Sequence, residues 1–515
     1  MPDTANSVKS RRPAVDAMVE AGPVHHTRRP DMTWRDHLVM LLTTGAEVEH
    51  ALMVQYLYAA YSLDSEHGSE AQRAMIEAWR ASILSVAREE MGHLLTVQNV
   101  LVLLGAPVNF GREMTPWDHE FYPFPFSLEP LSIESLQCFI YAEMPAHKGK
   151  TAAFVRQRPK VAPPTVSVEE QWEIVEEVKE ELGKRYDKMR IEADMHRVGE
   201  LYHEIIDIIE NPKLIPDSAF NEATFDMQAS WDDWGRGYKP DPRPLDPEGN
   251  IVEPDGEPSP ADGISISERP AHVQIERAAT RAQAAKALRA LTAQGEAPHL
   301  KKDDTGEPSH FERFIQIYRE FKDSQPSGGS WRATYPVPSN PTTRPDSDPK
   351  RTTYIGEEHD DEVAAHYFAQ LFNQRYRLLL AYLAHSFRLA RTQPMHQPGL
   401  RAMVMHRAFG EMYNLKTIAG LLVRLPLHSG YRAAPPFEMP YSLDLPQADR
   451  DIWLKYDDLI SSAYATCEKI FAKADEHTVV KEQIAAARAD FYLRSLMNLD
   501  TEARRWIGKI VAGAV

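Results

Sequence analysis

Two carboxylates in the N-terminal part of the chain stand in the middle of apolar helical patterns. Glu49 lies on a helical face with Ala46, Met53 and Tyr56. In the next predicted helix, Glu90 lies on a face with Val86, Ala87 and Leu94, and His93 follows Glu90 by three residues. This spacing places each carboxylate on the buried face of its helix. A buried carboxylate is costly to desolvate unless a positive charge meets it. A metal ion held between two facing helices would supply that charge.

The Glu-x-x-His motif alone does not identify a metal site, because it occurs several times, including at 47–50, 90–93, 200–203 and 307–310. The spacing is physically suitable, since residues three apart lie on one face of a helix. Glu90 and His93 stand out because Glu49 lies on the inward face of the preceding helix. The alternative interpretation is a buried Glu–His ion pair without a metal.

A complete di-iron carboxylate bundle needs one Glu from each of two helices and a Glu-x-x-His from each of the other two. Glu143 lies on a short predicted helix just before Pro145, and Glu200 with His203 supplies a second Glu-x-x-His in the required chain order. The predicted metal ligands are therefore Glu49, Glu90, His93, Glu143, Glu200 and His203. A solvated face is the alternative for the 200–203 motif, because the stripe on which it lies is wholly ionisable.

The ligand types indicate the metal. Carboxylate with imidazole suits iron first and manganese second, and the lack of a nearby cysteine argues against a structural zinc site. We expect two iron ions. Tyr56, on the helix of Glu49, is a candidate for passing an electron, with core packing as the alternative role of its ring. No Gly-x-Gly-x-x-Gly or Walker-type motif occurs.

The predicted elements are helices with long connections. Two helices at 34–64 and 70–104 are joined by a short polar turn and should form a hairpin. Capping residues predict a helix from Ser132 that stops at Pro145. Further helical patterns cover 167–211, 275–294, 309–322, 361–390, 400–424, 448–474 and 478–512. Strand patterns are scarce. The fold class is therefore all-α, divided into a metal-binding bundle at 30–211, Pro/Asp-rich loops with two helices at 212–350, and a C-terminal helical region at 351–515.

Bulk properties restrict the class of partner. The 515 residues carry a net charge of −17, which argues against nucleic acid as a partner. Two cysteines indicate a reducing compartment rather than a disulfide framework. Neither a secretory signal nor an apolar run of about 18 residues is visible. We expect a cytoplasmic protein that does not enter a membrane.

Several segments resemble the ferritin-like family that includes iminophenyl-pyruvate dimer synthase and chromopyrrolate synthase, oxidative coupling enzymes of bisindole pathways. The matching segments include EVEHALMVQYLYAAYSL at 47–63, AREEMGHLLTVQNVLVLLGAP at 87–107, YPFPFSLEPLSIESLQCFIYAEMP at 122–145 and QGEAPHLKKDDTGEPSHFERF at 294–314. The resemblance implies a ferritin-like four-helix bundle with long loop insertions and an additional C-terminal helical region. It also implies that Glu296 and His310 are metal ligands that could replace Glu143 or His203. The family's "GEG" reads GEA at 295–297, and insertions at 146–190 and 212–270 depart from the pattern.

The resemblance implies an iron-dependent oxidoreductase of secondary metabolism that uses O₂ or peroxide. Its substrate would be a small amino-acid-derived aromatic imine, and the reaction would be an oxidative dimerisation. The alternative in the same class is a di-iron oxygenase that hydroxylates, desaturates or N-oxygenates another small molecule. A ferroxidase and a non-catalytic scaffold are further alternatives. A pathway enzyme or a second copy of the chain stays open as a partner.

Overall fold

The structure is a computed structural model in which helices form most of the described chain. The described residues are 28–118, 122–145, 166–192, 198–230, 233, 273, 275–295, 308–324, 331–389 and 399–513. Within them, the strands β1 (Pro341–Thr342) and β2 (Thr353–Tyr354) form one short parallel pair. The prediction of an all-α fold is confirmed. None of the helices described combines the length and the apolar character needed to span a membrane.

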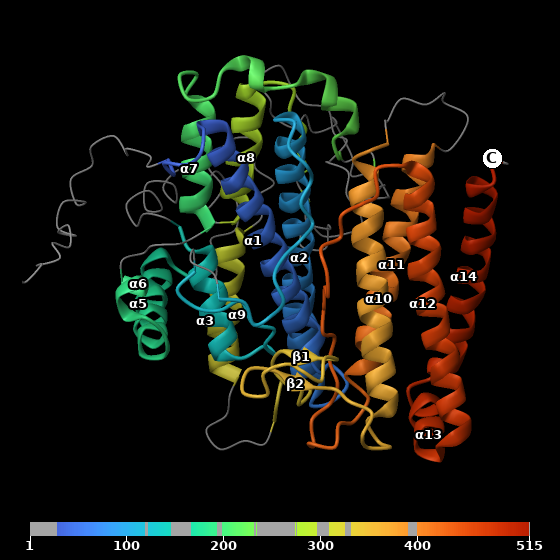
Figure 1. The fold of residues 1–515 in the computed structure, drawn as a ribbon. Coiled ribbons are helices and arrows are strands. Elements are labelled where there is room, and N and C mark those ends of the chain that lie inside the picture. Colours follow the sequence, from blue (N-terminus) through green and yellow to red (C-terminus); the bar gives the residue numbers. More distant parts are fainter. Residues whose placement is uncertain are drawn as a thin grey trace, which may run out of the picture.

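Helices α1 (Trp34–Ser62) and α2 (Glu70–Leu103) form the predicted antiparallel hairpin in the middle of the molecule (Figure 1). The side chain of Ser69 caps α2 in a reciprocal capping box with Gln72. Gly105 ends α2 with a φ of 68°, a left-handed conformation that costs glycine little. The helix boundaries agree closely with those predicted from the capping residues and the apolar spacing.

Helix α1 is buried almost all round between residues 46 and 60, whereas its pattern predicts one buried face. The second covering layer comes from distant parts of the chain. Tyr376 of α10 (Val363–Ser386) makes a hydrogen bond with His50, and the hydroxyl of Tyr58 donates to the carbonyl oxygen of Pro338. The long-range packing of these segments makes α1 the central helix of the structure.

Two further helical layers beside α1 and α2 are each interrupted at mid-height. Figure 1 shows α7 (Val198–Glu210) above α3 (Ile133–Glu143), and α8 (Arg281–Gly295) above α9 (His310–Ser324). Helix α3 starts at the predicted Ser132 cap and ends two residues before Pro145, as predicted. Four helix ends therefore meet beside the middle of α1 and α2.

Shorter elements cover the outside of this N-terminal bundle. Helices α5 (Val168–Arg185) and α6 (Lys188–Glu192) flank α3, and the 3₁₀ turns η2 (Asp217–Ala219) and η3 (Glu222–Met227) follow α7. The side-chain amide of Asn99 in α2 donates to the carbonyl oxygens of Ala229 and Glu276. This contact fastens the segment after η3 and the segment before α8 to the hairpin.

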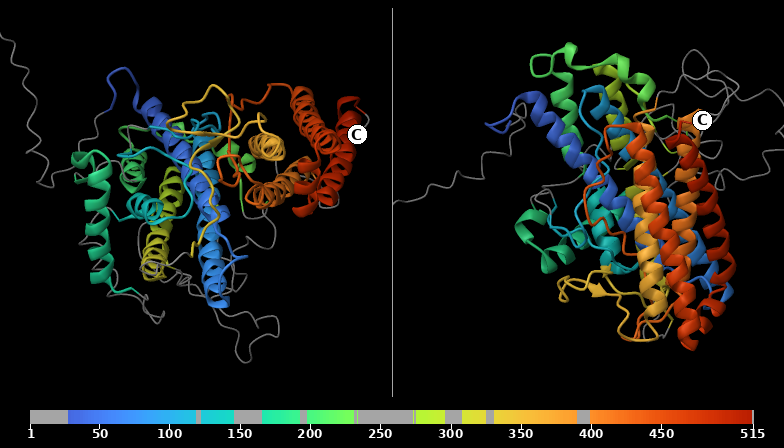
Figure 2. Two further views of the ribbon diagram at one scale, coloured as in Figure 1. Left: turned by 90° about the horizontal axis from the view of Figure 1, so that it is seen from below. Right: turned by 45° about the vertical axis from the view of Figure 1, so that its right-hand side comes forward.

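The remaining helices form a second bundle on the other side of α1 and α2 (Figures 1 and 2). They are α10, α11 (Leu400–Leu422), α12 (Asp449–Glu476), α13 (Thr478–Ala486) and α14 (Ala489–Val511). Buried Arg375 of α10 forms ion pairs with Asp500 of α14 and, at 3.3 Å, with Glu411 of α11. The division of the chain at residues 211 and 350 stays a prediction.

Candidate metal centre

A cluster of ionisable side chains lies where the interrupted layers meet the central hairpin. Glu49 comes from the middle of α1, Glu90 and His93 from the middle of α2, Glu143 from the last residue of α3, and His310 from the first residue of α9. Each is buried, with at most 3% of its surface exposed. The polar cluster therefore sits inside the apolar core rather than on a solvated face.

Local capping chemistry explains the position of the ligand-type residue on α9. The hydroxyl of Ser309 accepts a hydrogen bond from the backbone N–H of Glu312, and the Glu312 carboxylate accepts from the N–H of Ser309. This capping box starts the helix at His310. The imidazole is thus carried on the first turn and directed toward α2.

Glu90 lies between the two imidazoles and divides the cluster into two halves. Its Oε2 is 3.3 Å from Nδ1 of His93, and its Oε1 is 2.8 Å from Nδ1 of His310. Glu49 adds an oxygen 3.5 Å from Nδ1 of His93, and Glu143 adds one 3.6 Å from Nδ1 of His310. The imidazole rings stack with centroids 5.3 Å apart. Each half thus consists of one carboxylate and one imidazole, with Glu90 shared.

A buried tyrosine fixes the carboxylate of each half. Tyr202 of α7 donates a hydrogen bond of 2.6 Å to Oε1 of Glu49, and Tyr56 of α1 donates one of 2.6 Å to Oε1 of Glu143. Burial, and then the neighbouring carboxylate, raises the pKa of each tyrosine well above its usual value. Both phenols therefore stay protonated donors and leave Oε2 of each carboxylate turned toward the imidazoles.

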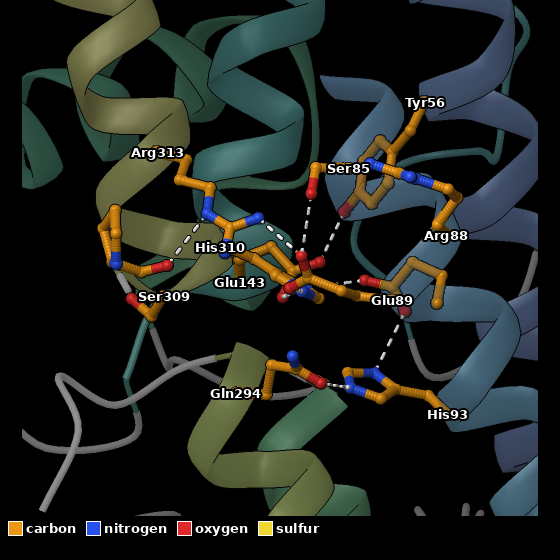
Figure 3. A network of polar contacts seen from close by, with 12 residues as sticks. Tyr56, Ser85, Arg88, Glu89, His93, Glu143, Gln294, Ser309, His310 and Arg313 are labelled. Carbon is orange, nitrogen blue, oxygen red and sulfur yellow. Dashed lines mark hydrogen bonds and ion pairs between the residues drawn. The ribbon is translucent and has the colours of Figure 1, made fainter. Parts of the chain in front are cut away.

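The outer nitrogen of each imidazole meets a hydrogen-bond acceptor (Figure 3). Nε2 of His93 lies 2.9 Å from the amide oxygen of Gln294, and Nε2 of His310 lies 2.9 Å from the carboxylate of Glu89. An acceptor at Nε2 requires the proton on that nitrogen in a neutral ring, which leaves the Nδ1 lone pair facing the cluster. Arg313 in turn donates to Glu89 at 2.7 Å.

The cluster carries more negative than positive groups, and its protonation reflects this. Burial and the neighbouring Glu90 raise the pKa of Glu49 to about 8. Burial opposes the charge on His93, yet Glu90 and Glu49 raise its pKa to about 10. Burial also works against ionisation of Glu89, but Arg313 and His310 lower its pKa to about 2. The protons on Glu49 and His93 offset part of the negative charge of the cluster, as a bound cation would.

The donor set fits a divalent metal ion. Ligand atoms of Glu90, His93 and His310 all lie within 4.8 Å of one another, the one such convergence of three side chains within the described ranges. Imidazole nitrogens and carboxylate oxygens without sulfur suit iron, manganese or zinc. The inward Nδ1 atoms and their outer acceptors match the way metal-bound histidines are held.

A small cavity with space for about one water molecule lies beside the cluster. Its polar wall includes Glu49, Glu90, His93 and Glu143, and the opposite wall comes from α7 and α8. Gly295 forms part of that wall, and a Cβ atom there would lie 3.1 Å from Oε2 of Glu143. The glycine lets the end of α8 approach the carboxylate closely.

The structure brings together four residues of the predicted ligand set, and His310 with them. Glu200 and His203 are half-buried on α7 and are not among the residues that line the cavity. The face of α7 that points inward carries Tyr202 and its isoleucines instead. Glu296 lies outside the described residues. Tyr56 contacts the site through Glu143.

Sequence reasoning missed Glu89, Tyr202, Gln294 and Arg313. Glu89 is one position off the predicted inward stripe of α2, yet it is fully buried because α9 packs against that flank. The sequence held two signals for this network: the neighbouring carboxylates Glu89 and Glu90, and the spacing of three residues between His310 and Arg313. The sequence placed Tyr202 on the apolar face of its helix but did not indicate its hydrogen bond to Glu49.

The N-terminal bundle that carries the cluster is similar to a known protein family. A family model described as ferritin-like matches residues 42–233, which contain Glu49, Glu90, His93 and Glu143. A solved structure of a ferritin-like protein from Caulobacter vibrioides is 15% identical, covers 78% of this chain and 97% of its own, and superposes with a TM-score of 0.36.

Two enzymes are similar to this chain in sequence, as the resemblance predicts. Dichlorochromopyrrolate synthase of Lentzea aerocolonigenes is 28% identical over 491 residues, which cover 88% of this chain and 41% of the synthase. The 2-imino-3-(indol-3-yl)propanoate dimerase of Chromobacterium violaceum is 33% identical over 132 residues, covering 20% of this chain and 13% of the dimerase. The chain thus spans about two fifths of the length of the synthase.

Proposed function

We propose that this chain binds two iron ions in the cluster of Glu49, Glu90, His93, Glu143 and His310. The convergence of these buried carboxylates and inward-facing imidazoles carries the proposal. Glu90 would serve both positions, because its two oxygens face different imidazoles. Glu200 and His203 are not part of this proposed set. Manganese is the second candidate metal, since it accepts the same ligand types.

We further propose that the protein is an oxidoreductase that joins two molecules of an amino-acid-derived aromatic imine. The names of the two similar enzymes support this proposal. Bound iron would supply one-electron chemistry with O₂ or peroxide. The chain contributes negative ligands that hold a cation, tyrosines that fix the orientation of two carboxylates, and a core that keeps water away.

A ferritin-like oxygenase that acts on another small molecule is the second candidate. The observation that favours it is the pair of insertions in the sequence at 146–190 and 212–270, because loops are where substrate preference most often changes. Hydroxylation, desaturation or N-oxygenation would use the same metal cluster. The two candidates therefore differ in the product formed and not in the ligands proposed.

Metal content is the first test. The protein is purified from iron-supplemented cells, and iron is measured by elemental analysis for wild type and for Glu90→Ala with His93→Ala. We expect about two irons per chain in wild type and loss of both in the double variant. Glu200→Ala with His203→Ala is the matched control, because it removes another Glu-x-x-His from the same bundle, and it should keep its iron. Wild type without metal would contradict the proposal and favour a scaffold.

The reaction is tested on the iron-loaded protein with 2-imino-3-(indol-3-yl)propanoate, supplied with O₂ or with peroxide. Mass spectrometry should detect a product two hydrogens lighter than two substrate molecules. A product one oxygen heavier than a single substrate would instead support the oxygenase. Oxidation of ferrous iron without any change in the organic molecule would support a ferroxidase.

A further inference from the structure

The two halves of the cluster are built alike on their inner side. Each half has one carboxylate and one imidazole, and each carboxylate accepts a tyrosine hydrogen bond of 2.6 Å. Glu90 is common to both and lies 3.3 Å from Nδ1 of His93 and 2.8 Å from Nδ1 of His310. On this inner side, the two positions would hold a cation with similar ligands.

The halves differ in the groups behind the imidazoles. His93 is backed by the neutral amide of Gln294 at 2.9 Å. His310 is backed by the carboxylate of Glu89 at 2.9 Å, and Glu89 also accepts hydrogen bonds from Arg313 at 2.7 Å and from Ser85 at 3.1 Å. Figure 3 shows both arrangements side by side. One imidazole therefore has an anionic support that is itself held by two donors, and the other has an uncharged support.

This difference has two physical consequences. A carboxylate makes a stronger hydrogen bond to an imidazole N–H than an amide oxygen does, which increases the basicity of the opposite ring nitrogen. A carboxylate is also only an acceptor, so it permits a single tautomer of the ring, whereas a side-chain amide can turn and offer an N–H instead. Nδ1 of His310 should therefore be the better donor and the better oriented one.

We propose that Glu89, held by Arg313, is a positioning residue that makes the two metal positions unequal. The half formed by Glu143 and His310 binds its ion more tightly and is filled first. The half formed by Glu49 and His93 is filled second. This inference rests on the proposed two-metal site, and it assigns an order of loading that the ligand types alone do not give.

The test is a titration of the metal-free full chain with Mn²⁺ under competition from a chelator, which measures binding without any activity assay. Wild type should show two steps that differ at least about tenfold in affinity. Glu89→Gln should weaken the tighter step by about 10- to 100-fold, so that the two steps merge. Gln294→Glu, which keeps Glu89 and Arg313, should instead strengthen the weaker step.

Removing one carboxylate ligand at a time identifies the halves. Glu143→Gln should abolish the tighter step, and Glu49→Gln should abolish the weaker step. Circular dichroism and a thermal melt of each metal-free variant show whether it has folded, and Gln294→Glu keeps the test decisive if Glu89→Gln has not. Two equal steps in wild type, unchanged steps in folded Glu89→Gln, or loss of the tighter step in Glu49→Gln would each overturn the inference while leaving the metal site in place. Failure of wild type to bind any metal would overturn the proposed function itself.

Discussion

Tyr202 joins α7 to α1 by donating a 2.6 Å hydrogen bond to the buried carboxylate of Glu49. The phenol is the contribution of α7 to a cluster whose other groups come from α1, α2, α3 and α9. It holds one oxygen of Glu49 and leaves the second directed at His93.

Replacement of this tyrosine should destabilise the metal-free protein. Tyr202→Phe leaves a buried carboxylate oxygen without its donor, which should cost about 1–3 kcal/mol in the free energy of unfolding. Urea denaturation of the metal-free chain measures the change. Tyr318→Phe is the control, since that phenol donates at 2.9 Å to a half-exposed carboxylate, Glu177, and its loss should cost about 1 kcal/mol or less. Equal losses in both variants would contradict the importance of the buried contact.

Replacement by alanine should have opposite effects on stability at two helical glycines. At Gly295 a Cβ would press on Glu143 at 3.1 Å, so Gly295→Ala should lower iron content and the melting temperature of the loaded protein. At Gly410 in α11, nothing lies within 4 Å of a new Cβ, and Gly410→Ala should stabilise by about 0.5–1 kcal/mol through helix propensity. Elemental analysis and thermal melts compare the two. Unchanged iron in Gly295→Ala would show that the carboxylate can shift without loss of binding.

The buried ion network of the C-terminal bundle should be costly to break. Arg375→Met leaves Asp500 and Glu411 in the core without their cation, which should cost about 3–5 kcal/mol. Arg494→Met, which breaks the exposed pair with Asp490, should cost under about 1 kcal/mol. Chemical denaturation followed by circular dichroism gives both values. A small effect at Arg375 would mean that the two carboxylates take up protons or water.

His385 in α10 should contribute to acid sensitivity. Burial, together with Arg388, lowers its pKa to about 4 against the opposing effect of Asp449, and its Nδ1 lies 2.9 Å from the Tyr456 hydroxyl. Above pH 6.5 the ring is neutral in both states and adds no pH dependence. Between pH 6.5 and about 4, the unfolded chain binds a proton that the folded chain does not. Stability should therefore fall by up to about 1.4 kcal/mol per pH unit as the pH decreases.

The measurement for His385 is the unfolding free energy of wild type and His385→Gln from pH 7 to pH 4. The difference between the two proteins should change with pH in this window and stay constant above it. Parallel curves throughout would exclude a contribution from this residue.

Metal removal should reveal the site through stability. Because an ion that binds only the folded chain stabilises it by mass action, a chelator should lower the melting temperature of the iron-loaded protein. The Glu90→Ala, His93→Ala double variant should melt at the same temperature with and without chelator. A chelator shift that persists in this variant would place the bound metal elsewhere.

Sequence periodicity was sufficient for the part of the site carried by continuous helices. Glu49, Glu90 and His93 lie on uninterrupted stripes, and the stop at Pro145 located the end of the helix that carries Glu143. The residues contributed by the interrupted layers were harder to predict. Chain order favoured the Glu-x-x-His at 200–203, whereas the packing of α7 turns Tyr202 inward. His310 entered only through family resemblance, because it is the first residue of α9 and has helical neighbours three and four positions away on one side only.

Long-range packing set the remaining limits. Glu89 is buried because α9, more than 200 residues later in the chain, covers its flank of α2. Likewise α1 is buried almost all round because the C-terminal bundle and the segment near Pro338 cover it. An amphipathic pattern describes one partner surface, so a helix with several partners hides more residues than its pattern predicts.

The interruption of two helical layers places two residues of the site at helix ends. Glu143 is the last residue of α3 and His310 is the first residue of α9, whereas Glu49, Glu90 and His93 lie deep within long helices. Fraying of a terminal turn costs far less free energy than opening the middle of a packed helix. Amide hydrogen exchange should therefore be faster at these two helix ends than around Glu90, and an ion bound as proposed would exchange while the hairpin stays folded.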